Sequence, residues 1–169
     1  MRPAHLVINA ASADEAAALL LRCCGSAAWV ERMMQRRPFA SAADVQAAAL
    51  EIWDNLSPVD VRAAFDHHPR IGAAVEADRQ PMSTADWSAA EQSGLAHADR
   101  AILDRLRAAN HAYESRFGFV FLVCATGKDG PEMLALLETR LHHDPEEEFR
   151  IAAMEQAKIT RLRLDNLGR

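Results

Sequence analysis

The chain has 169 residues, of which half are hydrophobic and one quarter are charged. This composition is typical of one globular domain, and a fold of this length buries roughly 70% of the unfolded chain's surface without needing a disulfide or a structural metal. Alanine is abundant and only one residue is tyrosine, which favours helices over a sandwich or barrel of short strands. The composition excludes collagen and a coiled coil, and the longest apolar runs are too short to span a bilayer.

The charges and the cysteines restrict the partners and the compartment. The formal net charge is −5 at pH 7 and the basic residues are scattered among acidic ones, so no nucleic-acid partner is expected. The cysteines number three, and two of them, Cys23 and Cys24, are adjacent, which predicts free thiols. Asp14 and Glu15 interrupt what would be the apolar core of a signal peptide. We therefore expect a cytoplasmic protein.

Serine residues mark the starts of the predicted helices in the first part of the chain. Ser12 and Glu15 have the spacing of a capping box, in which each side chain bonds the other residue's backbone N–H. Ser26 caps the next helix, which carries Trp29 and ends before Pro38, because proline disfavours helix in the residue that precedes it. The predicted helices cover residues 12–21, 26–37, 41–56 and 58–65.

Residues 66–83 lack helical periodicity and contain two prolines and several charges. Irregular stretches of this length inside compact domains are usually functional or disordered, and apolar residues within this one argue against full disorder. We expect helix again from about Thr84 or Ser88. A long amphipathic helix then follows, with a buried stripe formed by Ile102, Leu106, Ala109 and Tyr113.

Residues 117–124 are dense in aromatic and β-branched side chains. Because the sequence contains no obvious partner strand, we predict an extended core segment and not a strand. Helices are expected over residues 133–142 and 145–164, and the second of these begins with three glutamates that suit the positive end of a helix. The predicted fold is all-α, a single domain of about eight helices with one long irregular loop and one extended core segment.

Seven histidines raise the possibility of a metal site. Two pairs, His67-His68 and His142-His143, are adjacent in sequence, whereas helical metal ligands need a spacing of three or four residues to share a face. No H-E-x-x-H, C-x-x-C or G-x-S-x-G motif occurs, which disfavours a metalloprotease or a serine hydrolase. We interpret the histidines other than His67 and His68 as surface residues: His5, His97, His111, His142 and His143.

His68 differs from the other histidines because Pro69 follows it. Proline restricts the preceding residue to extended geometry, so the imidazole is expected on a stiff loop. An ordinary histidine pKa near 6.5 suits a proton carrier at neutral pH. From spacing alone, a loop histidine bonded to backbone groups is an equally good interpretation.

Glu91 and Arg163 are two further candidates, each with a structural alternative. Ser88 and Glu91 form a second capping-box pattern, so Glu91 is either a helix cap or a ligand-binding carboxylate at a helix N-terminus. Arg163 continues the inward stripe of the last helix, four residues after Ile159. An inward guanidinium requires a partner, which is either a core carboxylate or a bound carboxylate or carbonyl oxygen.

Four spaced motifs along the chain resemble those of the 2-oxo-4-hydroxy-4-carboxy-5-ureidoimidazoline (OHCU) decarboxylase family. In order they are His68-Pro69-Arg70-Ile71-Gly72, Ser88-x-x-Glu91-Gln92, Asn110-x-x-Tyr113-x-x-Arg116-Phe117-Gly118-Phe119 and Lys158-Ile159-x-x-Leu162-Arg163-Leu164. Trp29-Val30 and Arg37-Pro38-Phe39 are similar to the same family, so the resemblance covers nearly the whole chain.

The resemblance implies one OHCU decarboxylase-like domain over residues 1–169, active as a homodimer without a cofactor or metal. The implied reaction converts OHCU to (S)-allantoin and carbon dioxide in urate degradation, with no nucleic-acid or membrane partner. The implied catalytic residues are His68, Glu91 and Arg163. The implied substrate-binding residues are Pro69, Ser88, Gln92, Phe119, Val120, Phe121, Leu122 and Val123.

The sequence departs from the family pattern at one site position. Val120 stands where many members have proline in the F-G-F-P-F segment, which is expected to loosen that segment without removing its backbone groups. Residues 166–169 do not form a peroxisomal S-K-L address, in keeping with a cytoplasmic enzyme. Two alternatives stay open: a non-catalytic helical interaction module and a small metallohydrolase.

Overall fold

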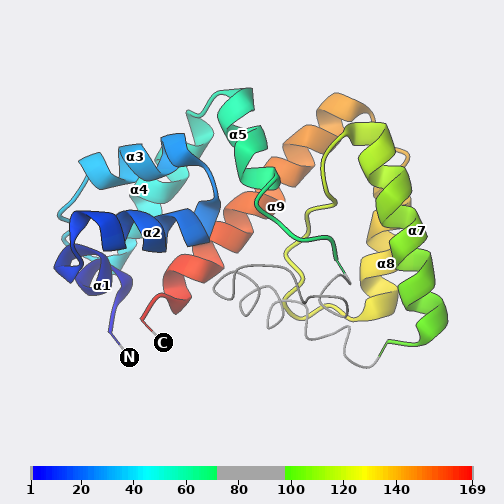
Figure 1. Ribbon diagram of the computed structural model, residues 1–169, viewed down its shortest axis with the longest axis horizontal. Helices are drawn as coiled ribbons and strands as arrows, with labels where there is room; N and C mark the ends of the chain where they lie inside the picture. The colour runs from blue at the N-terminus through cyan, green and yellow to red at the C-terminus, as the bar shows by residue number, and fades with distance from the viewer. Residues whose placement is uncertain (1, 72–97, 169) are drawn as a thin grey trace. The chain divides into compact units, whose positions relative to one another are not determined.

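The computed structural model describes residues 2–71 and 98–168, which form eight α-helices and no β-strand. The predicted all-α fold is therefore confirmed. The expected restart of helix at Thr84 or Ser88 lies outside the described residues. The helices are α1 (Ala4–Ala10), α2 (Ala13–Cys24), α3 (Ala27–Gln35), α4 (Ala42–Asp54), α5 (Pro58–Phe65), α7 (Arg100–Phe117), α8 (Gly130–Arg140) and α9 (Pro145–Asn166) (Figure 1).

The described residues divide into two compact units. Unit 1 contains residues 2–67 and 156–168, and unit 2 contains residues 68–71 and 98–155. Helix α9 contributes its first half to unit 2 and its second half to unit 1. The single domain over residues 1–169 stays a prediction.

Serine caps define the starts of α2, α3, α4 and α5 in unit 1, and those at Ser12 and Ser26 were predicted. Ser12 and Glu15 form the complete capping box at α2, and the Ser26 hydroxyl accepts from the Trp29 N–H at 3.4 Å. Ser41 and Ser57 cap α4 and α5 in the same way. These boundaries agree with the sequence because a cap depends only on residues within one helical turn.

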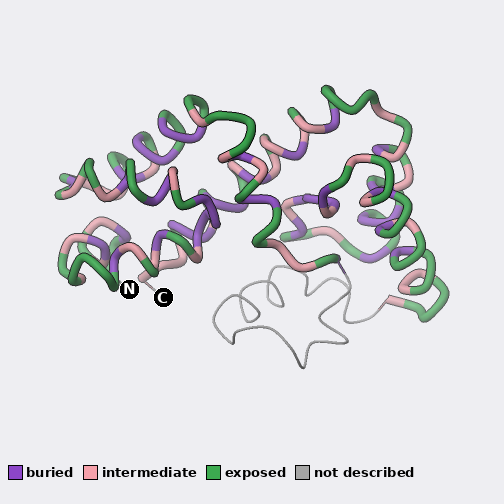
Figure 2. Tube along the Cα trace, turned by 45° about the horizontal axis from the view of Figure 1, so that its top comes forward, coloured by how far each residue is buried: buried purple, intermediate pink, exposed green. Residues whose placement is uncertain are grey.

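Unit 1 is built around the packing of α3 against α2 and α4. Trp29 is fully buried, and its indole N–H donates to the Ala49 carbonyl of α4 at 3.0 Å. Along the helices, buried residues alternate with exposed ones, as one inward face requires (Figure 2). The largest fully buried side chains of unit 1 are Ile8, Leu20, Trp29, Met33, Phe65 and Leu164.

Helix α1 was not expected from the sequence. It has only seven residues, its N-cap is Pro3, and no side chain caps it. Its contacts are tertiary: Ala4 and Ile8 are buried, and Arg37 donates to the Ala11 carbonyl at 2.7 Å. A helix this short forms because neighbouring elements hold it, which local sequence does not reveal.

Unit 2 contains α7 and α8, which lie side by side (Figure 1). The segment after α7 is neither helix nor strand over residues 118–129, as predicted, and we call residues 119–123 within it the extended segment. Tyr113 is buried at the centre of an aromatic cluster, with its ring 4.7, 5.7 and 5.3 Å from those of Phe117, Phe119 and Phe121. The cluster joins the end of α7 to the extended segment.

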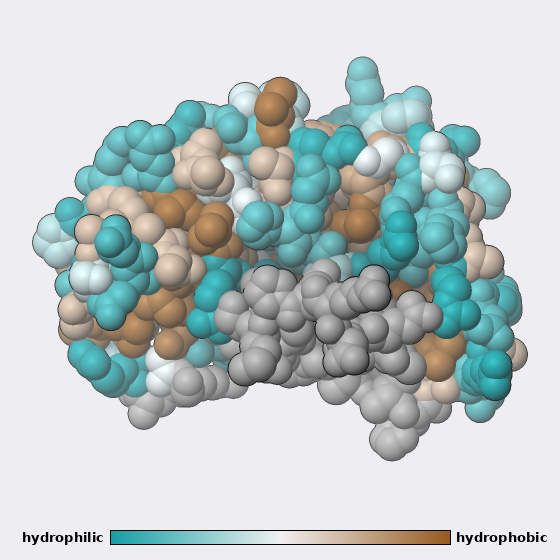
Figure 3. Space-filling model, viewed as in Figure 1, coloured by the Kyte–Doolittle hydropathy of each residue, from teal (hydrophilic) through white to brown (hydrophobic). Residues whose placement is uncertain are grey.

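The surface is mostly hydrophilic in the view of Figure 3, with small apolar areas between the polar side chains. The exposed large apolar residues are Leu6, Leu21, Leu50, Val59, Leu136 and Met154. Of the helices described, none has the length and hydropathy to cross a membrane.

Candidate active site

His68 lies in the short non-helical stretch that follows α5, as the sequence predicts. Its side chain is half-buried, and its Nε2 atom is excluded from solvent. We call residues 68–71 the His68 loop. This loop therefore presents a partly enclosed imidazole on backbone that belongs to no helix.

Two side chains of α7 bind the far end of the His68 loop. The Arg70 guanidinium donates two hydrogen bonds to the Glu114 carboxylate, at 2.5 and 2.7 Å. The Asn110 amide donates to the Ile71 carbonyl at 3.0 Å, and both residues are buried. The hydrogen bonds from Arg70 hold the pKa of Glu114 below its ordinary value, so this carboxylate stays ionised.

The neighbouring histidine has different surroundings. The His67 side chain is exposed, and its backbone N–H bonds the Ala64 carbonyl of α5 at 3.3 Å. It packs against Gly25, where a Cβ atom would lie 2.6 Å from the His67 Cβ. The adjacent histidines are therefore held by different parts of the fold.

Arg163 lies on the buried face of α9 and is 5% exposed. Its Nη1 donates to the Arg22 carbonyl at 3.2 Å, near the end of α2. The inward direction expected from the helical stripe is seen, and the partner described here is a backbone carbonyl. Burial raises the pKa of the nearby Cys24 thiol to about 12, an effect that the Arg163 charge opposes.

Gln156 adds a buried polar side chain to the same face of α9. It is 0% exposed, and its Nε2 donates to the Thr160 hydroxyl at 3.1 Å and to the Cys24 carbonyl at 3.5 Å. Gln156 lies on the same inward stripe as Ile159 and Arg163, and it is not among the site residues predicted from the sequence. A polar residue on this buried stripe, seven residues before Arg163, is the sequence signal that could have identified Gln156 as a candidate.

The extended segment 119–123 is largely enclosed. Val120 is half-buried and the other residues of the segment are buried. Arg140 fixes the segment, because its Nη1 donates to the Leu122 carbonyl at 2.7 Å and its guanidinium lies 4.6 Å from the Phe121 ring centre. The segment therefore lacks strand partners but is held by a side chain of α8.

Arg140 belongs to a buried ionic cluster around Glu148 that the sequence analysis missed. Glu148 is 0% exposed and accepts from Arg140 at 2.5 and 2.8 Å, while the Tyr113 hydroxyl donates to the same oxygen. His143 Nδ1 lies 2.8 Å from the other oxygen, so His143, expected at the surface, is half-buried with its ring against Glu148. Burial and the bond to Glu148 raise the pKa of Tyr113.

The predicted site residues are distributed over the chain as follows. His68, Pro69 and residues 119–123 belong to unit 2, and Arg163 belongs to unit 1. Ser88, Glu91 and Gln92 lie outside the described residues. The convergence of His68, Glu91 and Arg163 on one pocket therefore stays a prediction.

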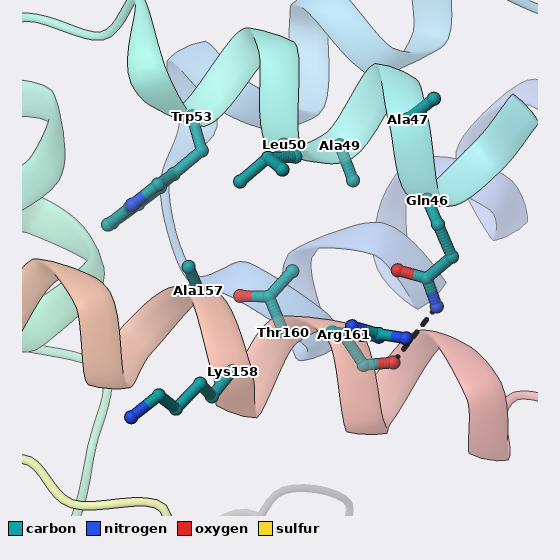
Figure 4. Close-up of a pocket in the computed structure, with 9 residues that line it drawn as sticks. All are labelled: Gln46, Ala47, Ala49, Leu50, Trp53, Ala157, Lys158, Thr160 and Arg161. Atoms are coloured by element: carbon teal, nitrogen blue, oxygen red, sulfur yellow. Dashed lines mark hydrogen bonds between the residues drawn. The ribbon is translucent and has the colours of Figure 1, made fainter.

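A groove between α4 and α9 in unit 1 has a volume of about 350 Å³ (Figure 4). Leu50 and Trp53 line it from α4, and Lys158 and Thr160 from α9. The Gln46 amide donates to the Arg161 carbonyl at 3.1 Å. Of the predicted site residues that lie within residues 2–71 and 98–168, none lines this groove. Among residues 2–71 and 98–168, no three His, Cys, Asp or Glu side chains are grouped to hold a metal ion.

Comparison with known proteins identifies the chain's relatives. Residues 9–165 match the family model described as OHCU decarboxylase. The uric acid degradation bifunctional protein TTL of Arabidopsis thaliana is 37% identical over 86% of this chain, which spans 45% of that protein. The 2-oxo-4-hydroxy-4-carboxy-5-ureidoimidazoline decarboxylase of Amia calva is 31% identical over 78% of this chain and 74% of its own length.

Solved structures agree with the sequence relatives. The crystal structure of an OHCU decarboxylase in the presence of (S)-allantoin matches with a TM-score of 0.74 and 35% identity, over 87% of this chain and 94% of the other. An (S)-allantoin synthase matches at 20% identity with a TM-score of 0.72, over 98% of this chain and 54% of the other, which supports the fold alone. With most of its length matched by the family model, this chain belongs to the OHCU decarboxylase family.

Proposed function

We propose that the chain catalyses the decarboxylation of OHCU to (S)-allantoin and carbon dioxide in urate degradation. The observation that carries this proposal is the match to the family model over residues 9–165. Within that range the chain keeps His68 before Pro69, Glu91 before Gln92, and Arg163 on the last helix.

The substrate supplies its own electron sink. The carbon that carries the carboxylate is next to a carbon–nitrogen double bond, so the electrons of the broken carbon–carbon bond form a new carbon–carbon double bond. The former double-bond pair moves to the ring nitrogen, which takes a proton. The resulting enol then loses its hydroxyl proton and gains one at the ureido-bearing carbon, which becomes the stereocentre of allantoin. This sequence conserves charge and needs no external oxidant or reductant.

The protein's task is then to move protons and stabilise charge. His68 hydrogen-bonds the substrate hydroxyl and carries a proton, for which an imidazole is suited at neutral pH. Glu91 orients that imidazole or binds the ureido and ring N–H groups. Arg163 contacts an oxygen whose negative charge grows in the transition state, because gripping the departing carboxylate would stabilise the ground state instead.

The extended segment forms a wall of the proposed pocket. Phe119 and Phe121 pack in the aromatic cluster around Tyr113, so their rings belong to the core. Pro69, Ser88 and Gln92 complete the substrate-binding set. A wall of this kind excludes water from the bound carboxylate and restricts protonation to one face of the intermediate.

We also propose that the protein acts as a homodimer in the cytoplasm. Family resemblance supports the dimer, and the three free cysteines are in keeping with a reducing compartment. Light scattering during size exclusion should give twice the chain mass of 18.6 kDa. A mass of one chain at micromolar concentration would contradict the dimer.

The reaction is tested by circular dichroism of allantoin made from fresh urate. Urate oxidase and 5-hydroxyisourate hydrolase generate OHCU, and the protein is then added or left out. With the protein, we expect a faster signal of one enantiomer, because protonation on one face is stereospecific. Slow formation of racemic allantoin at the same rate in both samples would contradict the proposal.

A further inference from the structure

The His68 loop is attached to α7 at two points, and the proposed reaction assigns no role to either attachment residue. Asn110 and Glu114 are one helical turn apart and share a face of α7. We propose that they are positioning residues that fix the His68 loop and thereby the imidazole. This inference rests on the proposed catalytic role of His68.

Asn110 is the buried attachment. It is 2% exposed, and its amide N–H binds the carbonyl of Ile71, which is 6% exposed. Asparagine is a poor helix former and a buried amide is costly, so neither the stability of α7 nor core packing explains this residue. What it supplies is a donor for a loop carbonyl that is enclosed. Without that donor the carbonyl is left buried and unsatisfied.

Glu114 is the charged attachment. Both of its oxygens accept from Arg70, at 2.5 and 2.7 Å, in the two-pronged geometry that fixes the plane of a guanidinium. The Glu114 side chain is 23% exposed and that of Arg70 is 48% exposed. The pair is partly open to solvent, so its contribution is smaller than that of Asn110 but adds a second fixed point.

The attachments at Arg70 and Ile71 restrict where the loop lies against α7 and how far it can turn. Between them and the imidazole stands Pro69, whose ring fixes one backbone angle and restricts His68 as well. Pro69 therefore removes one rotatable backbone bond between these attachments and the imidazole, and restricts those of His68. A catalytic group displaced by about 1 Å can lose about 100-fold in rate, so this stiffness matters to catalysis although the proposed reaction gives neither Asn110 nor Glu114 a contact with substrate.

The test uses Asn110→Leu, which keeps the size of the side chain and removes the donor. Glu114→Gln removes the charge and keeps the shape. Asp104→Asn is the matched control, because Asp104 pairs with Arg107 on α7 itself and does not contact the loop. We expect kcat to fall about 10- to 100-fold for Asn110→Leu and less for Glu114→Gln, with KM within about twofold. The control is expected to keep the wild-type rate.

A double-mutant cycle separates positioning from loss of folded protein. Each variant is combined with His68→Asn. The enzyme concentration is chosen so that the catalysed rate exceeds the rate of uncatalysed decay. If Asn110 acts through His68, its removal has little further effect in the His68→Asn background. If Asn110→Leu lowers kcat by the same factor in both backgrounds, this inference is overturned and the proposed function is left intact. Full activity of His68→Asn alone would overturn the proposed role of His68, and this inference with it.

Hydrogen exchange gives a second readout that does not depend on activity. The peptide covering residues 66–71 is expected to exchange faster in Asn110→Leu, while a peptide from α2 is unchanged. Unchanged exchange in residues 66–71 would show that the loop is held by other contacts and would overturn the inference.

Discussion

At the scale of single residues, the adjacent histidines His67 and His68 differ in how far their side chains are exposed. His67 is exposed, and its backbone N–H bonds the Ala64 carbonyl of α5. The His68 imidazole is half-buried, and its Nε2 atom is excluded from solvent. The sequence singled out His68 because proline follows it. It did not show that Asn110 and Glu114 hold the loop, since those contacts join positions about 40 residues apart.

We predict that His68→Asn and His67→Asn have unequal effects on catalysis. Asparagine keeps a polar side chain at either position but cannot carry a proton as imidazole does. The rate of stereospecific allantoin formation should fall about 100-fold or more for His68→Asn and stay within about twofold for His67→Asn. Steady-state kinetics with both variants at equal folded concentration checks this. Equal losses would contradict the role of the histidine that precedes proline.

Gly25 gives a stability prediction at the same scale. It ends α2 with a φ of +83°, and a Cβ there would lie 2.6 Å from the His67 Cβ. Gly127 has a similar φ of +80° but open space around it. The strain of a left-handed alanine is about 1–2 kcal/mol, so Gly127→Ala should lose that amount and Gly25→Ala clearly more. Urea denaturation measures both, and equal losses would mean that His67 moves aside without cost.

At the scale of elements, the extended segment 119–123 depends on side chains from helices. The Leu122 carbonyl accepts from Arg140, and the Cys124 N–H donates to Glu155 at 2.7 Å. Composition was enough to predict that the segment belongs to the core and forms no strand. Its anchors were not predictable, because Arg140 and Glu155 look in the sequence like ordinary charged residues of their helices.

We predict that Arg140 and Arg105, which both pair with a glutamate in unit 2, differ greatly in stability effect. Arg140 and Glu148 have side chains only 7% and 0% exposed, against 62% and 43% for Arg105 and Glu138. Arg140→Leu leaves a buried carboxylate without its main partner and should cost about 3–5 kcal/mol, whereas Arg105→Leu should cost about 1 kcal/mol or less. Thermal and urea unfolding of the two variants gives the comparison. A similar small loss for both would mean that Tyr113 and His143 suffice for Glu148.

Helix boundaries were predictable where the signal lies within one turn. Ser12 and Ser26 cap α2 and α3 as predicted, and the helices expected from Ser41 and Pro58 begin there with Ser41 and Ser57 as their caps. Helix α1 was missed because no side chain caps it and its stability comes from Arg37 and from burial of Ile8. The candidate site shows the same difference between local and tertiary signals. Motifs predicted its single residues, whereas the contacts that hold those residues are visible only in the fold.

At the scale of the whole molecule, the shifted pKa values set the pH range of stability. The pKa values of Glu15 and Glu114 are lowered by hydrogen bonds from Ser12 and Arg70, so the unfolded chain binds protons more readily than the fold as pH drops. The stability that they contribute is lost as pH falls through their folded pKa values. Cys24 and Tyr113 have raised pKa values, so stability also falls once the pH exceeds the unfolded pKa values of these groups.

The loss of stability at alkaline pH can be observed directly, because Tyr113 is the only tyrosine in the chain. An unfolded tyrosine ionises near pH 10, whereas burial and Glu148 keep the folded Tyr113 protonated well above that value. We predict that tyrosinate absorbance at about 295 nm, where an ionised phenol absorbs, stays absent while the helical circular dichroism is intact. It should then rise together with loss of helix as the pH passes the unfolding transition, and in Arg140→Leu both changes should move to lower pH. Reversible ionisation near pH 10 in a fully helical protein would contradict the burial of Tyr113 against Glu148.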